Sequence, residues 1–124
     1  MRKVIVIVDD TESVASSLAI ALEKIPGVET MVAQDPRTAL RLFASPELRI
    51  SAVVTDFNLP FLNGFELIRA IRNLDGYGKL PAVMITADEG AANAKTSEFS
   101  NPNAMFRKPF SMKEVCRVVE ELLR

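Results

Sequence analysis

Short apolar runs alternate along this chain with longer segments in which apolar residues recur every three or four positions. The first run, residues 4–8, reads VIVIV without polar alternation, which is typical of a strand buried on both faces of a parallel sheet. After it, Leu18 and Leu22 recur at helical spacing before Pro26-Gly27 ends the segment. We therefore expect a central strand followed by an amphipathic crossover helix.

The same alternation continues to the end of the chain. The weaker, partly alternating run over residues 28–33 suits a sheet edge. We expect strands over residues 28–33, 50–55, 80–85 and 104–106, and helices after Asp35-Pro36, after Asn63-Gly64 and over residues 111–123, the last with Val115, Val118, Val119 and Leu122 facing inward.

Residues 88–103 break the pattern. They carry few apolar side chains, and Gly90 and Pro102 limit any helix. We expect a short or mobile fourth helix there.

Five strands alternating with five helices predict an open α/β sheet of parallel strands with helices on both faces, because each parallel crossover needs a covering helix.

Composition narrows the class of function. The 124 residues suit one domain, residues 1–124, and the 15 basic and 16 acidic residues are interspersed. We therefore expect no direct binding to nucleic acid or to a membrane. The N-terminal apolar run stops at Asp9, too short for export or spanning, and the single cysteine, Cys116, suits a reducing compartment. These features predict a cytoplasmic protein with Cys116 as core filler.

Acids, a hydroxyl and a lysine follow the apolar runs. Each has an ordinary explanation alone, as a helix cap, a turn former or a solvated loop charge. Together they fall at the carboxyl ends of parallel strands, where open α/β sheets bind ligands. Carboxylates held together need a cation, and a hard divalent ion such as Mg2+ takes oxygen ligands, so the pattern predicts a metal-and-phosphoryl site. Its members are Asp9 and Asp10 after the first run, Asp56 after the third, Thr86 after the fourth and Lys108 after the fifth.

Four motifs carry a resemblance to a known family. In this order and spacing, VIVIVDD, VVTDFNLPFLNGFEL, VMITAD and MFRKPF resemble the receiver domain of two-component response regulators, with a likeness to chemotaxis regulators. The resemblance spans the whole chain. It implies a flavodoxin-like three-layer sandwich with five helices and a five-stranded parallel sheet of strand order 2-1-3-4-5.

The resemblance also implies roles for the acids. Asp56 would be the phosphoacceptor, and Asp9 and Asp10 would be acids of the Mg2+ site. Asp56 itself and the backbone carbonyl of Asn58 would be further ligands of the ion. The chemistry suits these roles, because a carboxylate is a competent nucleophile towards phosphorus and phosphoryl transfer chiefly needs positioning and neutralisation of charge.

Thr86 and Lys108 complete the implied site. The hydroxyl of Thr86 would meet the phosphoryl group, and Lys108 would pair with it as a point charge. The bond to Pro109 resembles the cis peptide of the family, with a plain trans turn as the alternative. Many receivers carry an aromatic switch residue three positions before the lysine. Met105 stands there instead, and its neighbour Phe106 should point to the opposite face of the sheet.

The implied function is a phosphorylation-controlled signalling switch. Asp56 would take a phosphoryl group from a histidine kinase or a histidine phosphotransfer protein. The surface of the fourth helix, fifth strand and fifth helix would then gain or lose an unknown downstream protein target. Such a domain catalyses only its own phosphorylation and dephosphorylation, so we do not expect a metabolic enzyme. We expect a monomer or weak dimer.

Other functions compete with this one. A docking module would keep the fold with Asp56 rarely modified; Met105 and the polar residues 88–103 support it, whereas the intact acids and lysine oppose it. A small phosphatase or a flavodoxin on a similar sheet fits poorly. Thr11 stands where aspartyl phosphatases need a second acid, and residues 10–13 do not form a phosphate-binding loop.

Overall fold

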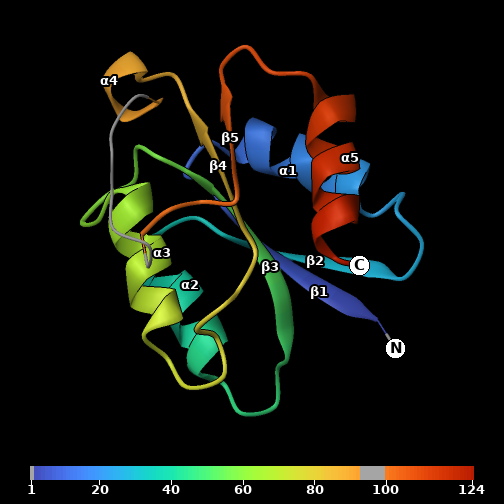
Figure 1. Ribbon diagram of the computed structural model, residues 1–124, viewed down its shortest axis with the longest axis vertical. Coiled ribbons are helices and arrows are strands. Elements are labelled where there is room, and N and C mark those ends of the chain that lie inside the picture. Colours follow the sequence, from blue (N-terminus) through green and yellow to red (C-terminus); the bar gives the residue numbers. More distant parts are fainter. Residues whose placement is uncertain (1, 93–99) are drawn as a thin grey trace.

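The computed structural model describes residues 2–92 and 100–124. These residues form a five-stranded parallel sheet in the order β2-β1-β3-β4-β5, with helices on both faces (Figure 1). The predicted fold class and strand order are confirmed, including the edge position of β2. The elements are β1 (Lys3–Val8), α1 (Glu12–Leu22), β2 (Val28–Ala33), α2 (Pro36–Ala44), β3 (Ile50–Asp56), α3 (Gly64–Arg72), β4 (Ala82–Thr86), α4 (Glu89–Ala92), β5 (Ala104–Arg107) and α5 (Met112–Leu122).

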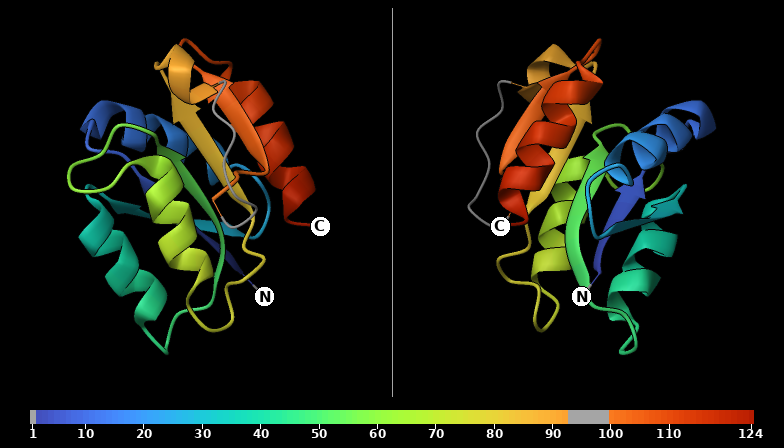
Figure 2. Two further views of the ribbon diagram at one scale, coloured as in Figure 1. Left: turned by 60° about the vertical axis from the view of Figure 1, so that its left-hand side comes forward. Right: turned by 90° about the vertical axis from the view of Figure 1, so that its right-hand side faces the viewer.

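The central strand β1 divides the interior into two cores. Ile5 and Ile7 pack with α1 and α5 on one face, whereas Val6 and Val8 pack with α2 and α3 on the other. All four side chains are 0% exposed, which confirms that this strand is buried on both faces. The views in Figure 2 show the sheet between these two helix layers.

Capping side chains fix where two of the helices begin. At α2, Asp35 accepts a hydrogen bond from the backbone N–H of Thr38 at 2.9 Å, and Pro36 occupies the first turn. At α3, Asn63 and Glu66 form a capping box in which each side chain accepts from the backbone N–H of the other, both at 2.9 Å. The loop that follows β3 therefore ends in a defined helix start.

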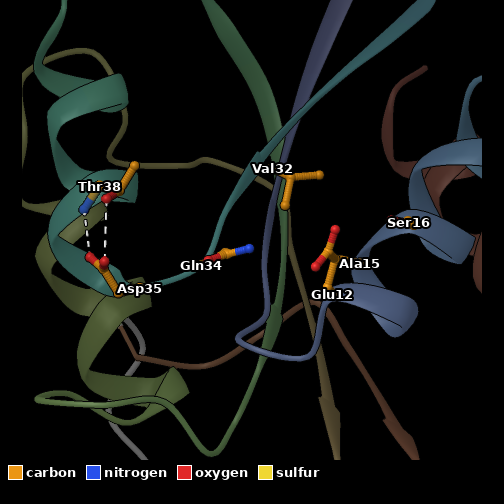
Figure 3. A pocket seen from close by; sticks show the side chains of 7 residues that line it. All are labelled: Glu12, Ala15, Ser16, Val32, Gln34, Asp35 and Thr38. Atoms are coloured by element: carbon orange, nitrogen blue, oxygen red, sulfur yellow. Dashed lines mark hydrogen bonds between the residues drawn. The ribbon is translucent and has the colours of Figure 1, made fainter.

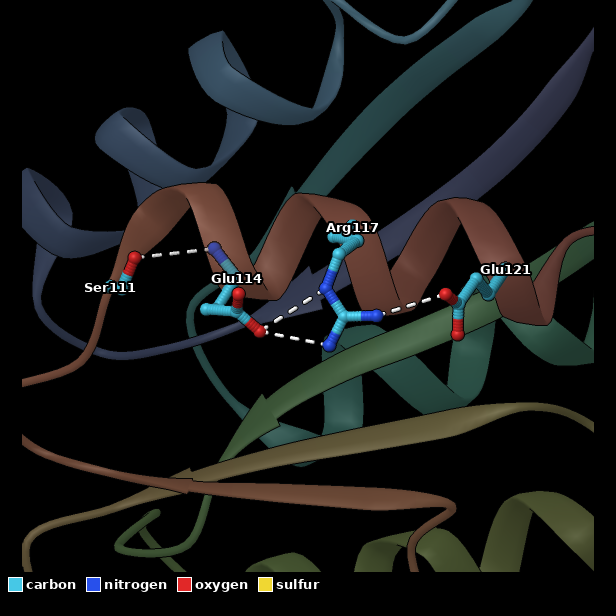
Figure 4. Close-up of polar contacts among 4 residues, drawn as sticks. All are labelled: Ser111, Glu114, Arg117 and Glu121. Carbon is cyan, nitrogen blue, oxygen red and sulfur yellow. Dashed lines mark hydrogen bonds and ion pairs between the residues drawn. The ribbon is translucent and has the colours of Figure 1, made fainter.

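Helix α5 carries a polar cluster on its outer face. Ser111 caps the helix by accepting from the backbone N–H of Glu114 at 3.2 Å, and Arg117 pairs with Glu114 and Glu121 at 2.9 Å each (Figure 4). The three charged side chains are 53–56% exposed. Such exposed pairs contribute only about 0–1 kcal/mol each, so the helix is held mainly by its apolar face.

The predicted inward face of α5 is confirmed at three of its four residues. Val115 and Val119 are buried, and Leu122 packs against the same core. Val118 is only half-buried and is absent from the described core contacts of α5. Cys116 is half-buried against the same core, as expected for core filler.

Strand β4 begins at Ala82, two residues later than the sequence predicts. Pro81 has no backbone N–H to donate to a strand ladder. Leu80 instead donates its N–H to the carbonyl of Tyr77 at 3.1 Å, in the turn before the strand. The proline and the turn before it thus make the strand shorter than the apolar run that predicts it.

Helix α4 begins at Glu89, within the polar segment 88–103 where the sequence predicts a short or mobile helix. The structure describes this helix over Glu89–Ala92, and residues 93–99 of the polar segment lie outside the described residues, so the predicted shortness stays a prediction. No helix in the described part of the chain is long and apolar enough to cross a membrane.

Candidate functional site

Strands β1 and β3 are neighbours in the sheet, so the acids at their carboxyl ends come together. Asp9 and Asp10 directly follow β1, and Asp56 is the last residue of β3. Carboxylate oxygens of these three residues lie within 4.8 Å of one another. Asp9 and Asp56 are 1% and 6% exposed, whereas Asp10 is exposed. The acids that the sequence places at one edge therefore form one cluster.

Burial dominates the electrostatics of Asp56. It raises the pKa of this carboxyl above its ordinary value, while the charge of Lys108 and the backbone N–H groups of Phe57 and Asn58 oppose the rise. Lys108 Nζ lies 3.6 Å from Asp56 Oδ1, within ion-pair range but longer than a direct hydrogen bond. The ammonium thus faces Asp56 and leaves that oxygen without a hydrogen bond.

Asp9 is placed by the start of α1. Its Oδ1 accepts a hydrogen bond from the backbone N–H of Thr11 at 2.8 Å, while the side chain of Thr11, at the capping position, makes no capping bond. Burial raises the pKa of Asp9, the Thr11 N–H opposes the rise, and the negative charge of Asp56 adds to it. Asp9 therefore stands in for a capping residue and keeps its second oxygen for the site.

Two carboxylate oxygens of the cluster lack a partner. Asp9 Oδ2 and Asp56 Oδ1 are buried and accept no hydrogen bond within the described structure. Buried polar atoms are rarely left in this state unless an ion, a water or a substrate completes them. Hard oxygen donors from three acids within 4.8 Å of one another suit a divalent cation such as Mg2+. The residues present thus fit the metal that the sequence predicts.

Thr86 ends β4 beside this cluster, but its hydroxyl is engaged by the following turn. The side chain is 0% exposed, and Oγ1 accepts a hydrogen bond from the backbone N–H of Asp88 at 2.8 Å. The carboxylate of Asp88 in turn accepts from the N–H of Ala91 at 3.0 Å, at the start of α4. The hydroxyl that the sequence assigns to a phosphoryl group is therefore part of the β4–α4 turn.

Lys108 reaches the site because β5 lies beside β4. Its backbone N–H donates to the carbonyl of Thr86 at 2.8 Å. The Lys108–Pro109 peptide bond is cis, the form that the family resemblance implies. The lysine side chain is 29% exposed and turns towards Asp56. The ammonium group of Lys108, directly after β5, thus lies at the end of the sheet where β1 and β3 supply the acids.

Strand β5 directs Met105 and Phe106 to opposite faces of the sheet, as expected. Phe106 packs against the core under α1 and α5, whereas Met105 packs against a separate cluster of Phe65, Met84 and Ala91. This cluster joins α3, β4 and α4. Met105 is thus in contact with the elements beside Thr86, and its role as a switch residue stays a prediction.

The sequence reading did not single out Phe61, in the loop between β3 and α3. It is 69% exposed and has a φ of 73°, the one positive value at a non-glycine residue in the described part of the chain. The guanidinium of Arg37 lies 4.0 Å from the centre of its ring. A left-handed conformation costs roughly 1–2 kcal/mol, and an exposed cation–π contact contributes about 0.5–1 kcal/mol. The contact with Arg37 therefore does not fully offset the backbone cost.

Gly64 is a second feature that sequence reasoning missed, because Asn63-Gly64 reads only as a loop marker. It is the first residue of α3, and a β-carbon there would lie 2.6 Å from Met84 Sδ and 3.0 Å from the carbonyl oxygen of Asp56. Only glycine lets the helix start this close to the end of β3. Gly64 thus holds α3 against the strand that carries Asp56.

A groove of about 460 Å³ lies beside the acids, between α1 and α2 at the carboxyl end of β2 (Figure 3). Glu12 and Ser16 of α1 form one wall, Thr38 of α2 forms the other, and Val32 and Gln34 lie between them. Val32 is 43% exposed. The groove adds an open surface next to the cluster of acids.

Comparison with known proteins identifies the family. The sequence profile of the response regulator receiver domain matches residues 5–120. The DNA-binding response regulator MtrA of Mycobacterium tuberculosis is 36% identical over 124 residues, which are 100% of this chain and 52% of that protein. The chain thus spans about half the length of the MtrA relatives. A chemotaxis protein CheY homolog of Campylobacter jejuni is 25% identical over 119 residues, covering 96% of this chain and 91% of that protein.

Solved structures agree on the fold. The chemotaxis response regulator CheY4 of Vibrio cholerae superposes with a TM-score of 0.84 at 24% identity, over 99% of this chain and 100% of that one. The signal receiver domain of an HD domain-containing protein from Pseudomonas fluorescens gives a TM-score of 0.84 at 23% identity, over 98% and 87% of the two chains.

The chain therefore belongs to the response regulator receiver domain family. Receiver domains are signalling modules rather than metabolic enzymes, and they work by phosphorylation. Response regulators receive phosphoryl groups from histidine kinases and act on downstream targets. Receiver domains generally bind Mg2+ at an aspartate cluster, and Asp9, Asp10 and Asp56 form such a cluster in this chain.

Proposed function

We propose that this domain, residues 1–124, is a phosphorylation-controlled switch in which Asp56 accepts the phosphoryl group. The observation that carries the proposal is the state of Asp56 Oδ1. This oxygen is buried without a hydrogen bond, beside two further carboxylates and 3.6 Å from an ammonium group. A nucleophile for phosphorus needs such a free oxygen and nearby positive charge.

The donor is a phosphohistidine of a histidine kinase or a histidine phosphotransfer protein. A carboxylate oxygen of Asp56 attacks phosphorus, a P–O bond forms, the P–N bond to the imidazole breaks, and its electron pair stays on the imidazole nitrogen. Lys108 pairs with the transferred group, because its ammonium already faces Asp56. The domain catalyses this step and the later hydrolysis only on itself.

Four groups would hold Mg2+: the carboxylates of Asp9, Asp10 and Asp56 and the backbone carbonyl of Asn58. The bound ion would neutralise charge on the phosphoryl oxygens. Asp9 is oriented for this task by the Thr11 N–H, which occupies its other oxygen. Asp10 is exposed, so it can bind the ion without a large change in its surroundings.

Thr86 connects the modified aspartate to the output surface. In the present structure Thr86 Oγ1 accepts from Asp88 N–H at 2.8 Å and donates its proton to the Asp88 carbonyl at 3.5 Å. Donation of that proton to a phosphoryl oxygen would replace the contact with the Asp88 carbonyl. That turn leads into α4, and Met105 packs against the cluster of Phe65, Met84 and Ala91, the last of which belongs to α4. Movement of Thr86 would thus reach the surface formed by α4, β5 and α5.

The same reasoning sets the expected partners. A downstream protein would bind the α4–β5–α5 surface in one phosphorylation state. The domain would itself bind neither nucleic acid nor membrane, and it would act in the cytoplasm as a monomer or weak dimer. The name of MtrA includes DNA binding, and the chain matches only about half of that protein, so we assign DNA binding to no residue here.

Intact-protein mass after incubation with acetyl phosphate tests the proposal. We expect one Mg2+-dependent phosphate adduct on the wild type, none on Asp56→Asn, and an undiminished adduct on Asp75→Asn, which removes an exposed acid from the turn after α3. If a folded, Mg2+-binding wild type gains no adduct from acetyl phosphate or from a phosphorylated histidine kinase, the docking module becomes the better reading. An adduct that persists in Asp56→Asn would place the acceptor elsewhere.

A further inference from the structure

We propose that Phe61 anchors the phosphohistidine-bearing protein that phosphorylates Asp56, with Arg37 as its positively charged neighbour. This inference rests on the proposed function and names the surface through which the donor reaches the site. It is carried by the exposure of Phe61, its strained backbone and its place in the loop that begins directly after Asp56.

Phe61 combines two unfavourable features. An aromatic side chain that is 69% exposed leaves apolar area in water, and a φ of 73° is uncommon for a bulky residue. Its described contact is the stack with Arg37, at 4.0 Å from the ring centre, which covers one face of the ring. Strained backbone clusters at functional sites, and aromatic residues are enriched in protein–protein interfaces relative to the rest of the surface.

The loop that carries Phe61 is fixed at both ends. Phe57 donates its N–H to the carbonyl of Ile85, and Gly64 donates its N–H back to the carbonyl of Phe57, both at 2.9 Å. The Asn63 capping box holds the far end at the start of α3. The ring is thus presented on a short, closed loop rather than on a loose segment, which lowers the entropy lost on binding.

The surface around Phe61 extends towards the groove beside the acids. Arg37, which stacks on the ring, is followed by Thr38, which lines the groove together with Val32. Phe61 and Val32, two of the large apolar side chains exposed in the described chain, therefore flank the first turn of α2. A partner could bury both while it faces the guanidinium of Arg37.

The position of Phe61 near Asp56 indicates which protein binds there. A protein that brings a phosphohistidine to Asp56 must approach the carboxyl edge of the sheet, and so it covers the loop that starts at Phe57. The donor surface that fits has an apolar pocket for the free face of the Phe61 ring and a carboxylate for Arg37. A small donor such as acetyl phosphate needs neither contact, which separates docking from chemistry.

The test compares two donors on three chains: the wild type, Phe61→Gly and Phe61→Tyr. The donors are acetyl phosphate and a purified, phosphorylated histidine kinase that transfers its phosphoryl group to the wild type. Glycine accepts a positive φ and removes the ring, whereas tyrosine keeps the ring. We expect kcat/KM for transfer from the kinase to fall by about tenfold or more in Phe61→Gly, as for a binding hot spot. Phe61→Tyr should stay within about twofold of the wild type, because it keeps the anchor.

Adduct formation from acetyl phosphate should be the same in all three chains. Equal kinase transfer to the wild type and Phe61→Gly would overturn the inference. A parallel loss with both donors would also overturn it, because Phe61 would then shape the site rather than the docking surface. Absence of any Asp56 adduct in the wild type, with either donor, would instead refute the proposed function. Phe61→Asn, which also tolerates a positive φ, repeats the measurement should Phe61→Gly fold poorly.

Discussion

Asp56 and Asp9 keep carboxylates in surroundings that disfavour the charged form. Each is buried, each has its pKa raised by that burial, and each has one oxygen without a hydrogen bond. An unsatisfied buried polar atom costs about 1–3 kcal/mol. The acids therefore reduce the stability of the metal-free protein, which is expected of residues retained for chemistry rather than for folding.

Replacing Asp56 with asparagine should stabilise the metal-free protein. A raised pKa means that the folded state binds the proton more tightly than the unfolded chain does, so the wild type gains stability as pH falls through the raised value. That gain is complete below the ordinary value of 3.8. At neutral pH we expect Asp56→Asn to unfold with a free energy about 1 kcal/mol higher than the wild type. The difference in free energy of unfolding between Asp56→Asn and the wild type should shrink as the pH is lowered. Urea titrations in the presence of a chelator measure it.

Asp35→Asn is the matched control for that experiment. The backbone N–H of Thr38 lowers the pKa of Asp35, so this carboxylate contributes stability at neutral pH that is lost as pH falls through its lowered folded value. The variant should therefore gain no stability at neutral pH. An Asp56→Asn protein that is less stable than the wild type at neutral pH would show that its carboxylate is satisfied in the fold.

The elements beyond the site are joined by one buried arginine at the end of α3. Arg72 donates Nε and Nη2 to the carbonyl of Leu80 at 3.1 and 2.8 Å, Nη2 also to Asn103 Oδ1 at 3.0 Å, and Nη1 to the carbonyl of Asn101. Asn103 Oδ1 accepts from Ala82 N as well, at 2.8 Å. One guanidinium thus fixes α3 to the start of β4 and to the segment that enters β5.

Arg72→Lys should destabilise the protein by about 2–3 kcal/mol in urea unfolding, because an ammonium lacks the planar fork that serves these acceptors. Arg69→Lys, on the exposed side of the same helix, should change stability by less than about 0.5 kcal/mol. Adduct formation from acetyl phosphate should survive in the folded fraction of both variants, since Arg72 lies at the other end of the sheet from Asp56. Equal stability of the two variants would refute this role of Arg72.

The elements could be predicted from sequence because each depends on a local pattern. The VIVIV run of β1 has no polar face, so it reads as a doubly buried strand without knowledge of its neighbours. The start of α2 is equally local, because Asp35 and Pro36 supply the cap and the first turn. Val118 is only half-buried, because helical spacing alone does not determine how wide a stripe of the helix the neighbouring elements cover.

The site could be predicted only in part. Strand ends place Asp9, Asp56 and Lys108 at one edge, and the structure brings them together there. The hydroxyl of Thr86 could not be placed, because its partner is set by the backbone of the next turn. The positive φ of Phe61 leaves no mark in the residue type, and its neighbour Arg37 is distant in sequence. Both depend on contacts between segments rather than on pattern.

The whole molecule divides its tasks between the two edges of the sheet. The carboxyl edge holds unsatisfied acids, a strained aromatic residue and an open groove, whereas the opposite edge holds the hydrogen-bond network of Arg72. The Arg72 network thus stabilises the fold far from Asp56, whereas the unsatisfied acids near Asp56 lower the free energy of unfolding. Binding of a cation at the carboxyl edge should therefore raise the stability of the entire cooperative unit.

Mg2+ should raise the free energy of unfolding of the wild type in proportion to the logarithm of its concentration. At about 100 times its dissociation constant the gain is about 2.7 kcal/mol for a single site. Asp10→Asn tests the ligand role in isolation, because Asp10 is exposed and its loss should change metal-free stability by less than about 0.5 kcal/mol. We expect this variant to need a much higher Mg2+ concentration for the same gain in urea titrations.

Asp56→Asn should behave differently from Asp10→Asn under the same titration, since it starts from a higher metal-free stability and also loses a ligand. Asp75→Asn, which removes an exposed acid outside the cluster, should follow the wild type at every Mg2+ concentration. This ordering separates a specific site from general screening of negative charge, because screening would affect Asp10→Asn and Asp75→Asn alike. Equal Mg2+ dependence in all four proteins would mean that the three acids do not form a metal site, whatever the outcome of phosphorylation.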